Sequence, residues 1–476
     1  MANLGRVCEA ITGTTPPKNN IENYGRDVPF VKPPQLKDKP INDAPEKLSI
    51  QGAKFARVLP SNSVLVTCIG NLGRTAINRI PVAFNQQINA LIPSEILISS
   101  FLFYQAQSPN FKKQLEGLAS ATTVTIVNKG KFETIQISIS PLPEQHRIVA
   151  KIEELFSELD KGVEALKTAQ QQLKVYRQAV LQRAFEGKLT EEWRAQQKEL
   201  PTAAQLLEQI KAEREKQGKT IGKKFKPVPP ITETELTELP TLPDGWCWVR
   251  LSYVGQIETG TTPQKSNSEF YGNDYPFFKP TDLDAGYNVR KAYDNLSVLG
   301  IQQARFLPED SVLVTCIGAT IGKTGVIRSR GASNQQINAV IPFTPLNHNY
   351  LYFQIIGHFF QKQILVNASA TTLPILNKSK FEVLLIVICT YNEQIQIVQE
   401  IEARLSVADK VEETISQSLQ QAEALRQSIL KKAFAGKLVP QDPNDEPASK
   451  PLERIKAEKA AQATVKGTVS GRGKLI

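Results

Sequence analysis

The chain has 476 residues, which is too long for one ordinary domain and predicts two to four domains. Lys and Arg number 57 against 47 Asp and Glu, and 41% of the residues are hydrophobic, which excludes a largely disordered chain and indicates a basic bias. The longest strongly apolar run, Val383 to Cys389, is far shorter than the roughly 18 residues of a bilayer span, and no apolar segment after Met1 predicts a secretion signal, so we expect a cytoplasmic protein without membrane contact.

The sequence contains a duplication. Thr-Gly-Thr-Thr-Pro at 12–16 recurs at 259–263, Val-Leu-Val-Thr-Cys-Ile-Gly at 64–70 recurs at 312–318, and Asn-Gln-Gln-Ile-Asn-Ala at 85–90 recurs at 334–339. The spacing between the copies grows from 247 to 249 residues, which two single-residue insertions explain. Since this period is far longer than the roughly 20 to 50 residues of solenoid repeats, it indicates a duplicated module.

Each copy begins with a block of mixed secondary structure, at 1–143 and at 241–391. Short β-branched runs that end at glycine, such as 63–69, predict strands. The segment 96–115 predicts a helix interrupted by Pro109, and 346–365 is its approximate counterpart. We therefore expect two tandem α+β blocks.

A long helix is predicted after each block, at 144–189 and at 392–438. Apolar residues spaced by four and three over about five heptads predict a coiled-coil seam in the first helix, while the second helix has a weaker seam. The alternative is that each helix packs on its own block. The seam residues are Ile148, Ile152, Leu155, Leu159, Leu166, Leu173 and Tyr176 in the first helix, and Ile397, Ile401, Val411, Ile415, Leu425 and Ile429 in the second.

Two polar segments complete the chain. Residues 190–240 join the first helix to the second block, and their proline- and threonine-rich distal part is typical of a linker. Residues 439–476 form a C-terminal tail, in which 452–458 resembles 207–213.

Catalytic and metal-binding patterns are missing from the sequence. Five cysteines contain no C-x-x-C pair, and three scattered histidines offer no zinc spacing, so we expect neither a metal nor a cofactor in this chain. Gly318 to Thr324 resembles a phosphate-binding loop but has three residues between its glycines where the motif needs four. We expect no active site.

The remaining signals are those of recognition. Both blocks carry more Lys and Arg than Asp and Glu, which suits contact with phosphates but is also compatible with an ordinary soluble surface. Thr14, Thr15 and Lys18, with Thr261, Thr262 and Lys265, combine hydroxyls and a cation as a phosphate site does, although a turn kept for its geometry explains the motif equally well.

Amide side chains recur in both blocks as Asn85 and Gln86, and as Asn334 and Gln335. Such amides can pair with adenine edges, but identical residues in both copies favour a role inside the fold, because readers of different sequences should differ. The divergent stretches, 35–47 against 282–295 and 71–79 against 319–330, are therefore where base-specific contacts are expected. The other candidate DNA-binding residues are Lys32, Lys37, Lys39, Asn71, Arg74, Lys279, Asp282, Arg290, Lys291, Lys323, Arg328 and Arg330.

Taken in order, these motifs resemble the specificity subunits of type I restriction-modification systems. Each block begins with the Thr-Gly-Thr-Thr-Pro turn, and each helix begins with Glu-Gln-x-x-Ile, in Pro141 to Ile148 and in Tyr391 to Ile397. Each helix ends with Ala-Phe-x-Gly-Lys-Leu, at 184–189 and at 433–438. The second copy departs from the first in lacking the Pro-Leu-Pro lead.

The resemblance implies a non-catalytic subunit that binds double-stranded DNA. Each block would be a target-recognition domain for one half of a split site, and the helices would pair as an antiparallel coiled coil with pseudo-two-fold symmetry. It also implies two modification subunits that use S-adenosylmethionine, and restriction subunits that use ATP and Mg. Two rival hypotheses are a protein-binding coiled-coil scaffold and a standalone nuclease or methyltransferase.

Overall fold

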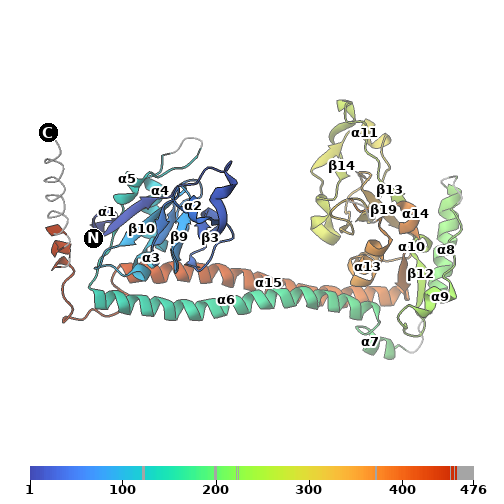
Figure 1. Ribbon diagram of the computed structural model, residues 1–476. Helices are drawn as coiled ribbons and strands as arrows, with labels where there is room; N and C mark the ends of the chain where they lie inside the picture. The colour runs from blue at the N-terminus through green and yellow to red at the C-terminus, as the bar shows by residue number, and fades with distance from the viewer. Residues whose placement is uncertain are drawn as a thin grey trace. The chain divides into compact units, whose positions relative to one another are not determined.

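The computed structural model describes residues 1–120, 124–197, 201–220, 222, 225–369, 373–450, 452–454 and 456–457. The chain forms two compact units, one from Met1–Lys167 with Ser416–Ile476 and the other from Thr168–Ile415. Two 44-residue helices, α6 (Leu142–Phe185) and α15 (Tyr391–Phe434), each contribute one part to both units (Figure 1). They begin within two residues of the starts predicted from sequence.

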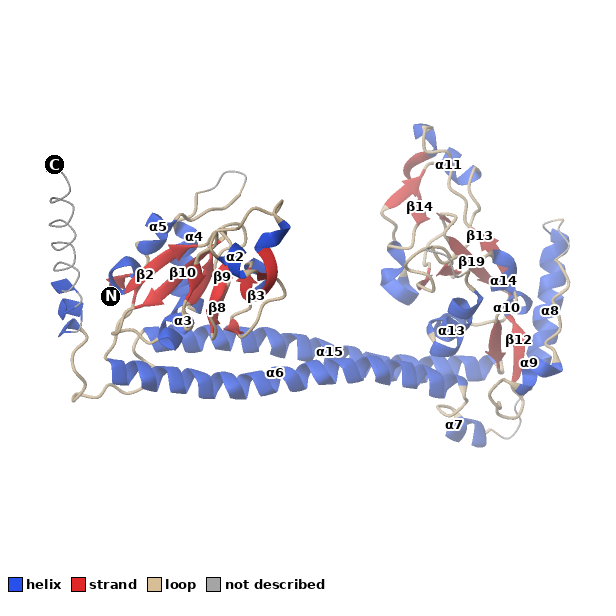
Figure 2. Ribbon diagram, in the orientation of Figure 1, coloured by secondary structure: helices blue, strands red, loops and turns tan. Residues whose placement is uncertain are grey.

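The first unit is built on two sheets formed by strands from residues 1–143 (Figure 2). One has the order β2-β10-β7-β8-β4 and is antiparallel except where β4 pairs with β8; the other has the order β5-β3-β9-β6, and a small β1-β11 sheet lies apart. All residues of β7, β8 and β9 are buried, because their β-branched and small side chains face core on both sides of the sheet. The strands are β1 (Ala2–Asn3), β2 (Cys8–Thr12), β3 (Tyr24–Val31), β4 (Lys39–Ile41), β5 (Lys47–Leu48), β6 (Val58–Leu59), β7 (Val64–Thr67), β8 (Thr75–Asn78), β9 (Val82–Phe84), β10 (Ile88–Pro93) and β11 (Gln136–Ile137).

Helices cover this sheet and join it to the long helices. The predicted segment 96–115 forms two helices that are separated at Ser108, whose side chain caps the second helix beside Pro109. Phe101, Phe111 and Phe132 are buried with Ile152 of α6 and Leu430 of α15 in one core. The helices are α1 (Leu4–Val7), η1 (Ile21–Asn23), η2 (Pro33–Gln35), α2 (Ile50–Ala53), α3 (Ser99–Gln107), α4 (Pro109–Gly117) and α5 (Lys129–Glu133).

The second unit repeats this plan. Its sheets have the orders β13-β19-β16-β17, β15-β14-β18 and β12-β20. The segment 346–365 is also broken into two helices, here at Gly357, where no break was predicted. The strands are β12 (Cys247–Arg250), β13 (Gly255–Thr259), β14 (Tyr271–Phe278), β15 (Asp294–Leu296), β16 (Val312–Thr315), β17 (Thr324–Val326), β18 (Ala332–Ser333), β19 (Ile337–Pro342) and β20 (Leu385–Ile388), and the helices are α10 (Leu251–Val254), η3 (Ser268–Phe270), η4 (Asp282–Asn288), α11 (Val298–Gln302), α12 (His348–Ile356), α13 (His358–Asn367) and α14 (Lys378–Glu382).

The segment predicted as a linker is largely a packed part of the second unit. It holds α7 (Glu191–Ala195), α8 (Ala203–Thr220) and α9 (Glu233–Thr237). Ala203, Leu206 and Ile210 are buried in the core of that unit. The sequence prediction missed this packing because the three apolar residues are diluted among many charged ones.

Side chains of α6 and α15 contact each other within each unit. Ile148, Ile152, Ile397, Ile401, Ile415 and Ile429 of the predicted seam are buried, and Leu155, Leu159, Leu166 and Leu173 are partly buried. Tyr176, Val411 and Leu425 differ from the prediction, because their side chains are 43%, 42% and 52% exposed. An α-helix has 3.6 residues per turn, whereas the predicted apolar pattern repeats every 3.5 residues. The pattern therefore drifts around the helix, and at these three positions the residue that follows faces the partner helix.

Those next residues are Arg177, Glu412 and Arg426, and all three form ion pairs between the helices. In the second unit Arg177 contacts Asp409 at 2.7 Å and Glu412 at 2.8 Å. In the first unit Arg426 pairs with Asp160, and its guanidinium lies 4.2 Å from the ring centre of Phe156.

Within the described residues, no helix is both long and apolar enough to cross a membrane.

Candidate nucleic-acid interface

The two divergent stretches of the first block lie side by side. Strand β4 of one stretch pairs in parallel with β8 of the other, placing Lys39 opposite Ala76. Asp38 accepts hydrogen bonds from Thr75 N at 3.0 Å and Thr75 Oγ1 at 2.7 Å. Residues 35–47 and 71–79 thus lie side by side, with residues 75–78 buried and Lys37, Lys39, Arg74 and Arg79 exposed.

The second block also brings its divergent stretches together. Lys323 pairs with Asp284 at 2.6 Å. The backbone N–H of Arg328 donates to Val289 O at 2.8 Å, and Ser329 Oγ donates to Arg290 O at 3.1 Å. The position of the two stretches is therefore shared between the blocks, while their side chains differ.

Several predicted DNA-binding residues are exposed on these surfaces. Lys37 and Lys39 line a groove of about 700 Å³ in the first unit, with Glu153, Asp160 and Glu423 of the long helices among its other lining residues. Arg74 is exposed beside Asn71, which accepts from the Arg74 guanidinium at 2.9 Å when its amide is turned to suit that donor. Lys18, Lys265, Arg290, Lys291 and Arg330 are also exposed.

Other predicted residues are engaged inside the fold. Lys32 pairs with Glu46, and Lys279 pairs with Asp294. Asp282 accepts from the backbone N–H groups of Lys279 and Tyr293 at 2.7 and 3.0 Å, so its carboxylate holds a loop. The Arg328 guanidinium donates to Tyr287 O at 2.9 Å and to Asn349 Oδ1 at 2.7 Å, and it also pairs with Asp310 at 2.5 Å.

The two motifs that recur without change contact each other. Thr15 Oγ1 donates to Gln86 Oε1, and Thr14 N donates to Phe84 O at 2.9 Å. A Cβ on Gly13 would lie 2.1 Å from Asn85 O, so only glycine allows this approach.

The second unit has the same contact. Thr262 Oγ1 donates to Gln335 Oε1, Thr261 N donates to Ser333 O at 2.9 Å, and a Cβ on Gly260 would lie 2.0 Å from Asn334 O. Asn85 and Asn334 are buried, and each donates to a glutamine two residues later, at 3.0 and 2.8 Å. The structure thus gives these amides a role within the fold.

Two residues other than the individually named candidates also belong to these surfaces. Arg79 is exposed, lines the groove with Lys37, and donates to Asn62 Oδ1 at 2.9 Å. Tyr293 is 91% exposed in the second block. Both lie within the divergent stretches, so their position alone marked them as candidates.

The described residues offer little reactive chemistry. No group of three or more His, Cys, Asp or Glu side chains among them could hold a metal ion. Burial raises the pKa of Cys68 and of Cys316 to about 12, so neither thiol ionises near neutral pH. Burial also lowers the pKa of His348, which leaves its imidazole neutral.

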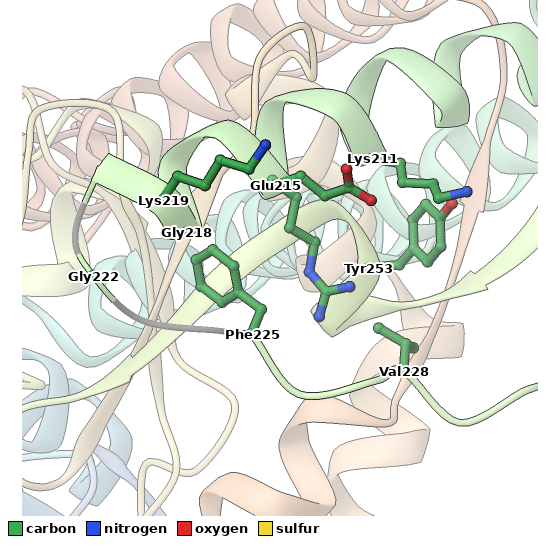
Figure 3. Close-up of a pocket in the computed structure, with 9 residues that line it drawn as sticks. Lys211, Glu215, Gly218, Lys219, Gly222, Phe225, Val228 and Tyr253 are labelled. Atoms are coloured by element: carbon green, nitrogen blue, oxygen red, sulfur yellow. The ribbon is translucent and has the colours of Figure 1, made fainter.

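A pocket of about 720 Å³ lies between α8 and α10 in the second unit (Figure 3). Lys211, Glu215 and Lys219 extend into it from α8, and Tyr253 extends from α10. Arg214 stacks on Phe225 at 5.4 Å and donates to Lys226 O at 2.6 Å. The pocket therefore combines cations with a carboxylate and belongs to the packing of α8 on the domain.

Comparison with known proteins decides the family. The family model described as "Type I restriction modification DNA specificity domain" matches residues 1–168 and 243–421. The chain belongs to this family. Its two matched regions coincide with the two blocks and the starts of the long helices, so the fold is a tandem pair of α+β specificity domains.

Similar proteins extend over nearly the whole chain. The type I restriction enzyme EcoDI specificity subunit of Escherichia coli is 25% identical and covers 85% of this chain and 86% of its own length. The EcoKI specificity subunit of Escherichia coli strain K12 is 23% identical and covers 98% of this chain and 97% of its own length. A solved structure described as "Structural basis underlying complex assembly and conformational transition of the type I R-M system" has a TM-score of 0.67 at 20% identity, covering 92% of this chain and 97% of its own.

Proposed function

We propose that this chain is the DNA-specificity subunit of a type I restriction-modification complex and that each specificity domain reads one half of a bipartite site. The observation that carries this proposal is that both domains are built on the same frame of recurring motifs and differ in the stretches that this frame holds. In both domains the two divergent stretches lie side by side, while the residues that hold the frame recur unchanged. Exposed cations such as Lys37 and Arg290 supply contacts to phosphate, and neighbouring side chains read base edges.

The long helices act as a spacer between the two domains. We infer an antiparallel coiled coil with pseudo-two-fold symmetry, and the ion pairs support it. In an antiparallel pair, a step forward along one helix matches an equal step back along the other. Asp160 and Arg177 are 17 residues apart on α6, and their partners Arg426 and Asp409 are 17 residues apart in the reverse direction on α15. The duplication also relates the two ion pairs to each other: Arg177 and Arg426 are equivalent residues 249 positions apart, and so are Asp160 and Asp409.

The catalytic steps belong to partner subunits in this proposal. A body with pseudo-two-fold symmetry accepts two copies of one modification subunit, which methylate adenine with S-adenosylmethionine. Restriction subunits use ATP and Mg to translocate and cleave DNA. This chain supplies recognition in the cytoplasm, where the DNA lies, and binds no cofactor itself.

Selection of bound DNA from a random pool tests the proposal. The chain is co-purified with the modification subunit and selected at near-physiological salt, because non-specific binding dominates at low salt. We expect two short defined half-sites across a fixed undefined spacer. Replacing residues 35–47 by the chain's own residues 282–295 should change one half-site and leave the other half-site and the spacer unchanged.

A Lys32→Gln variant serves as the control, because Lys32 lies just before the exchanged stretch and is held by Glu46. Its selected sequence should equal that of the wild type. Enrichment of no sequence, or a change in both half-sites after the exchange, would overturn the assignment.

A further inference from the structure

Because the domain is duplicated, two kinds of surface can be distinguished by comparing the two copies. A surface that reads DNA must differ between the domains if the half-sites differ, whereas a surface that binds two copies of one partner must be the same in both. Buried repeats such as Val64 to Thr67 are explained by the core. Exposed side chains that recur at equivalent positions need another explanation.

Four recurring segments meet on one surface of the first domain. Thr15 bonds Gln86, and the following Gln87 O accepts from Cys68 N at 2.8 Å. Val127 N then donates to Cys68 O at 2.9 Å, and Gly70 N donates to Thr125 O at 2.9 Å. The segments 13–18, 68–70, 85–87 and 124–127 are thus joined by hydrogen bonds.

The second domain repeats the arrangement contact for contact. Thr262 bonds Gln335, and Gln336 O accepts from Cys316 N at 2.7 Å. Leu376 N donates to Cys316 O at 2.8 Å, and Gly318 N donates to Pro374 O at 3.0 Å.

Apolar side chains are exposed at the same place in both domains. Val124 and Ile126 are 49% and 40% exposed, and their counterparts Leu373 and Ile375 are 50% and 40% exposed. Other exposed apolar residues fall into two groups: Ile21 and Phe55 correspond to the polar Ser268 and Gln303, whereas Ile50 and Val58 correspond to the exposed Val298 and Phe306 and lie outside the four joined segments. We call Thr15, Lys18, Gln86, Val124 and Ile126, with Thr262, Lys265, Gln335, Leu373 and Ile375, the shared strip.

We propose that the shared strip of each domain is a docking surface for one copy of the modification subunit. This inference rests on the proposed function, which supplies a partner present twice. Two exposed apolar side chains bordered by an amide, a hydroxyl and a lysine have the composition of a protein interface, with an apolar centre and a polar rim. A phosphate-binding surface would need more cations than the one lysine in each strip.

The test counts modification subunits on the full-length chain by native mass spectrometry. Wild-type chain should bind two, Ile126→Asp and Ile375→Asp one each, and the double variant none. The affinity at each altered domain should fall more than about tenfold, because the charge lies at the centre of an apolar contact. Phe55→Asp, a charge on an exposed and unshared residue, should still bind two.

Each other outcome decides a separate question. A wild-type chain that binds no modification subunit overturns the proposed function itself. A double variant that still binds two overturns only the shared strip as the docking surface. Normal assembly with weaker DNA binding by the isolated chain assigns the strip to DNA, and strip-dependent dimers of the chain alone assign it to self-association. If the double variant melts well below the wild type, the milder Ile126→Ser and Ile375→Ser pair replaces it.

Discussion

Two glutamates at equivalent positions, near the starts of the long helices, have different surroundings. Glu393 is 1% exposed and accepts from Thr190 Oγ1 and Trp246 Nε1, both at 2.8 Å, and from Arg194. Glu144 is 6% exposed, yet no donor among the described residues bonds its carboxylate, and burial raises its pKa. Val439 and Pro443 stand where the duplication would place the threonine and the arginine.

We therefore expect Glu393→Ala to destabilise the protein strongly. Removing Glu393 from this buried ionic network leaves Arg194 without its carboxylate partner and Trp246 Nε1 without its acceptor, which costs about 3–5 kcal/mol. Denaturant unfolding at neutral pH measures the loss. A cost below about 1 kcal/mol would show that the network is not needed.

Glu144→Gln is the matched control and should have the opposite sign. A carboxyl whose pKa is raised in the folded state stabilises it only while protonated, below the unfolded pKa of about 4.5, and that contribution is lost as pH rises through the folded pKa. The variant should match the wild type near pH 4 and exceed its unfolding free energy at pH 7 by roughly 0.5 kcal/mol.

At the scale of elements, the long helices pair through charges as well as apolar residues. The two arginines are held by different means: Arg177 has two carboxylate partners, whereas Arg426 has one carboxylate and the face of Phe156. The arginine side chains are 26% and 24% exposed and those of Asp409 and Asp160 are 69% and 59% exposed, so water screens each pair mainly from the carboxylate side. These contacts compensate for a seam whose central leucines are only partly buried.

Charge reversal tests the pairing. Asp160→Arg should destabilise the protein by about 1–2 kcal/mol, since it replaces the ion pair with Arg426 by repulsion between two cations. Arg426→Asp should restore most of that loss in the double variant. Arg177→Asp should not, because Arg177 pairs with Asp409, and equal rescue by both would contradict the pairing.

At the scale of the whole molecule, the duplication and its consequences could be predicted from sequence, because exact motifs recur in order over most of the chain. Two tandem α+β domains and two long helices follow from that repeat and from the apolar spacing. The role of Arg328 could not be predicted, since its partners Tyr287 and Asn349 are distant in sequence. The role of Asp282 could not be predicted either, since it depends on the loop geometry that brings the backbone N–H groups of Lys279 and Tyr293 to its carboxylate. The packing of α8 was hidden for a similar reason, because Ile210 gains its burial from a domain that follows it.

Each unit is assembled from segments that are distant in sequence. We therefore predict that the two fragments of a chain cut once between α7 and α8 stay associated. Unit one combines 1–167 with 416–476, so a protease site between Gln197 and Pro201 would leave both fragments contributing a helix to both cores. Ile148 and Ile152 are buried with Leu430, and Leu181 and Ala184 are buried with Ile397. We expect the fragments to co-elute in gel filtration at micromolar concentration and to separate only in denaturant.

A matched variant shows whether these cores hold the fragments. Ile152→Asp with Ile429→Asp places two carboxylates in the first core, where unpaired charge is costly, and should let the cut fragments separate at lower denaturant. Fragments of the unmutated chain that separate without denaturant would mean that only the intact chain between Gln197 and Pro201 holds them together, and that each long helix belongs to its preceding domain alone.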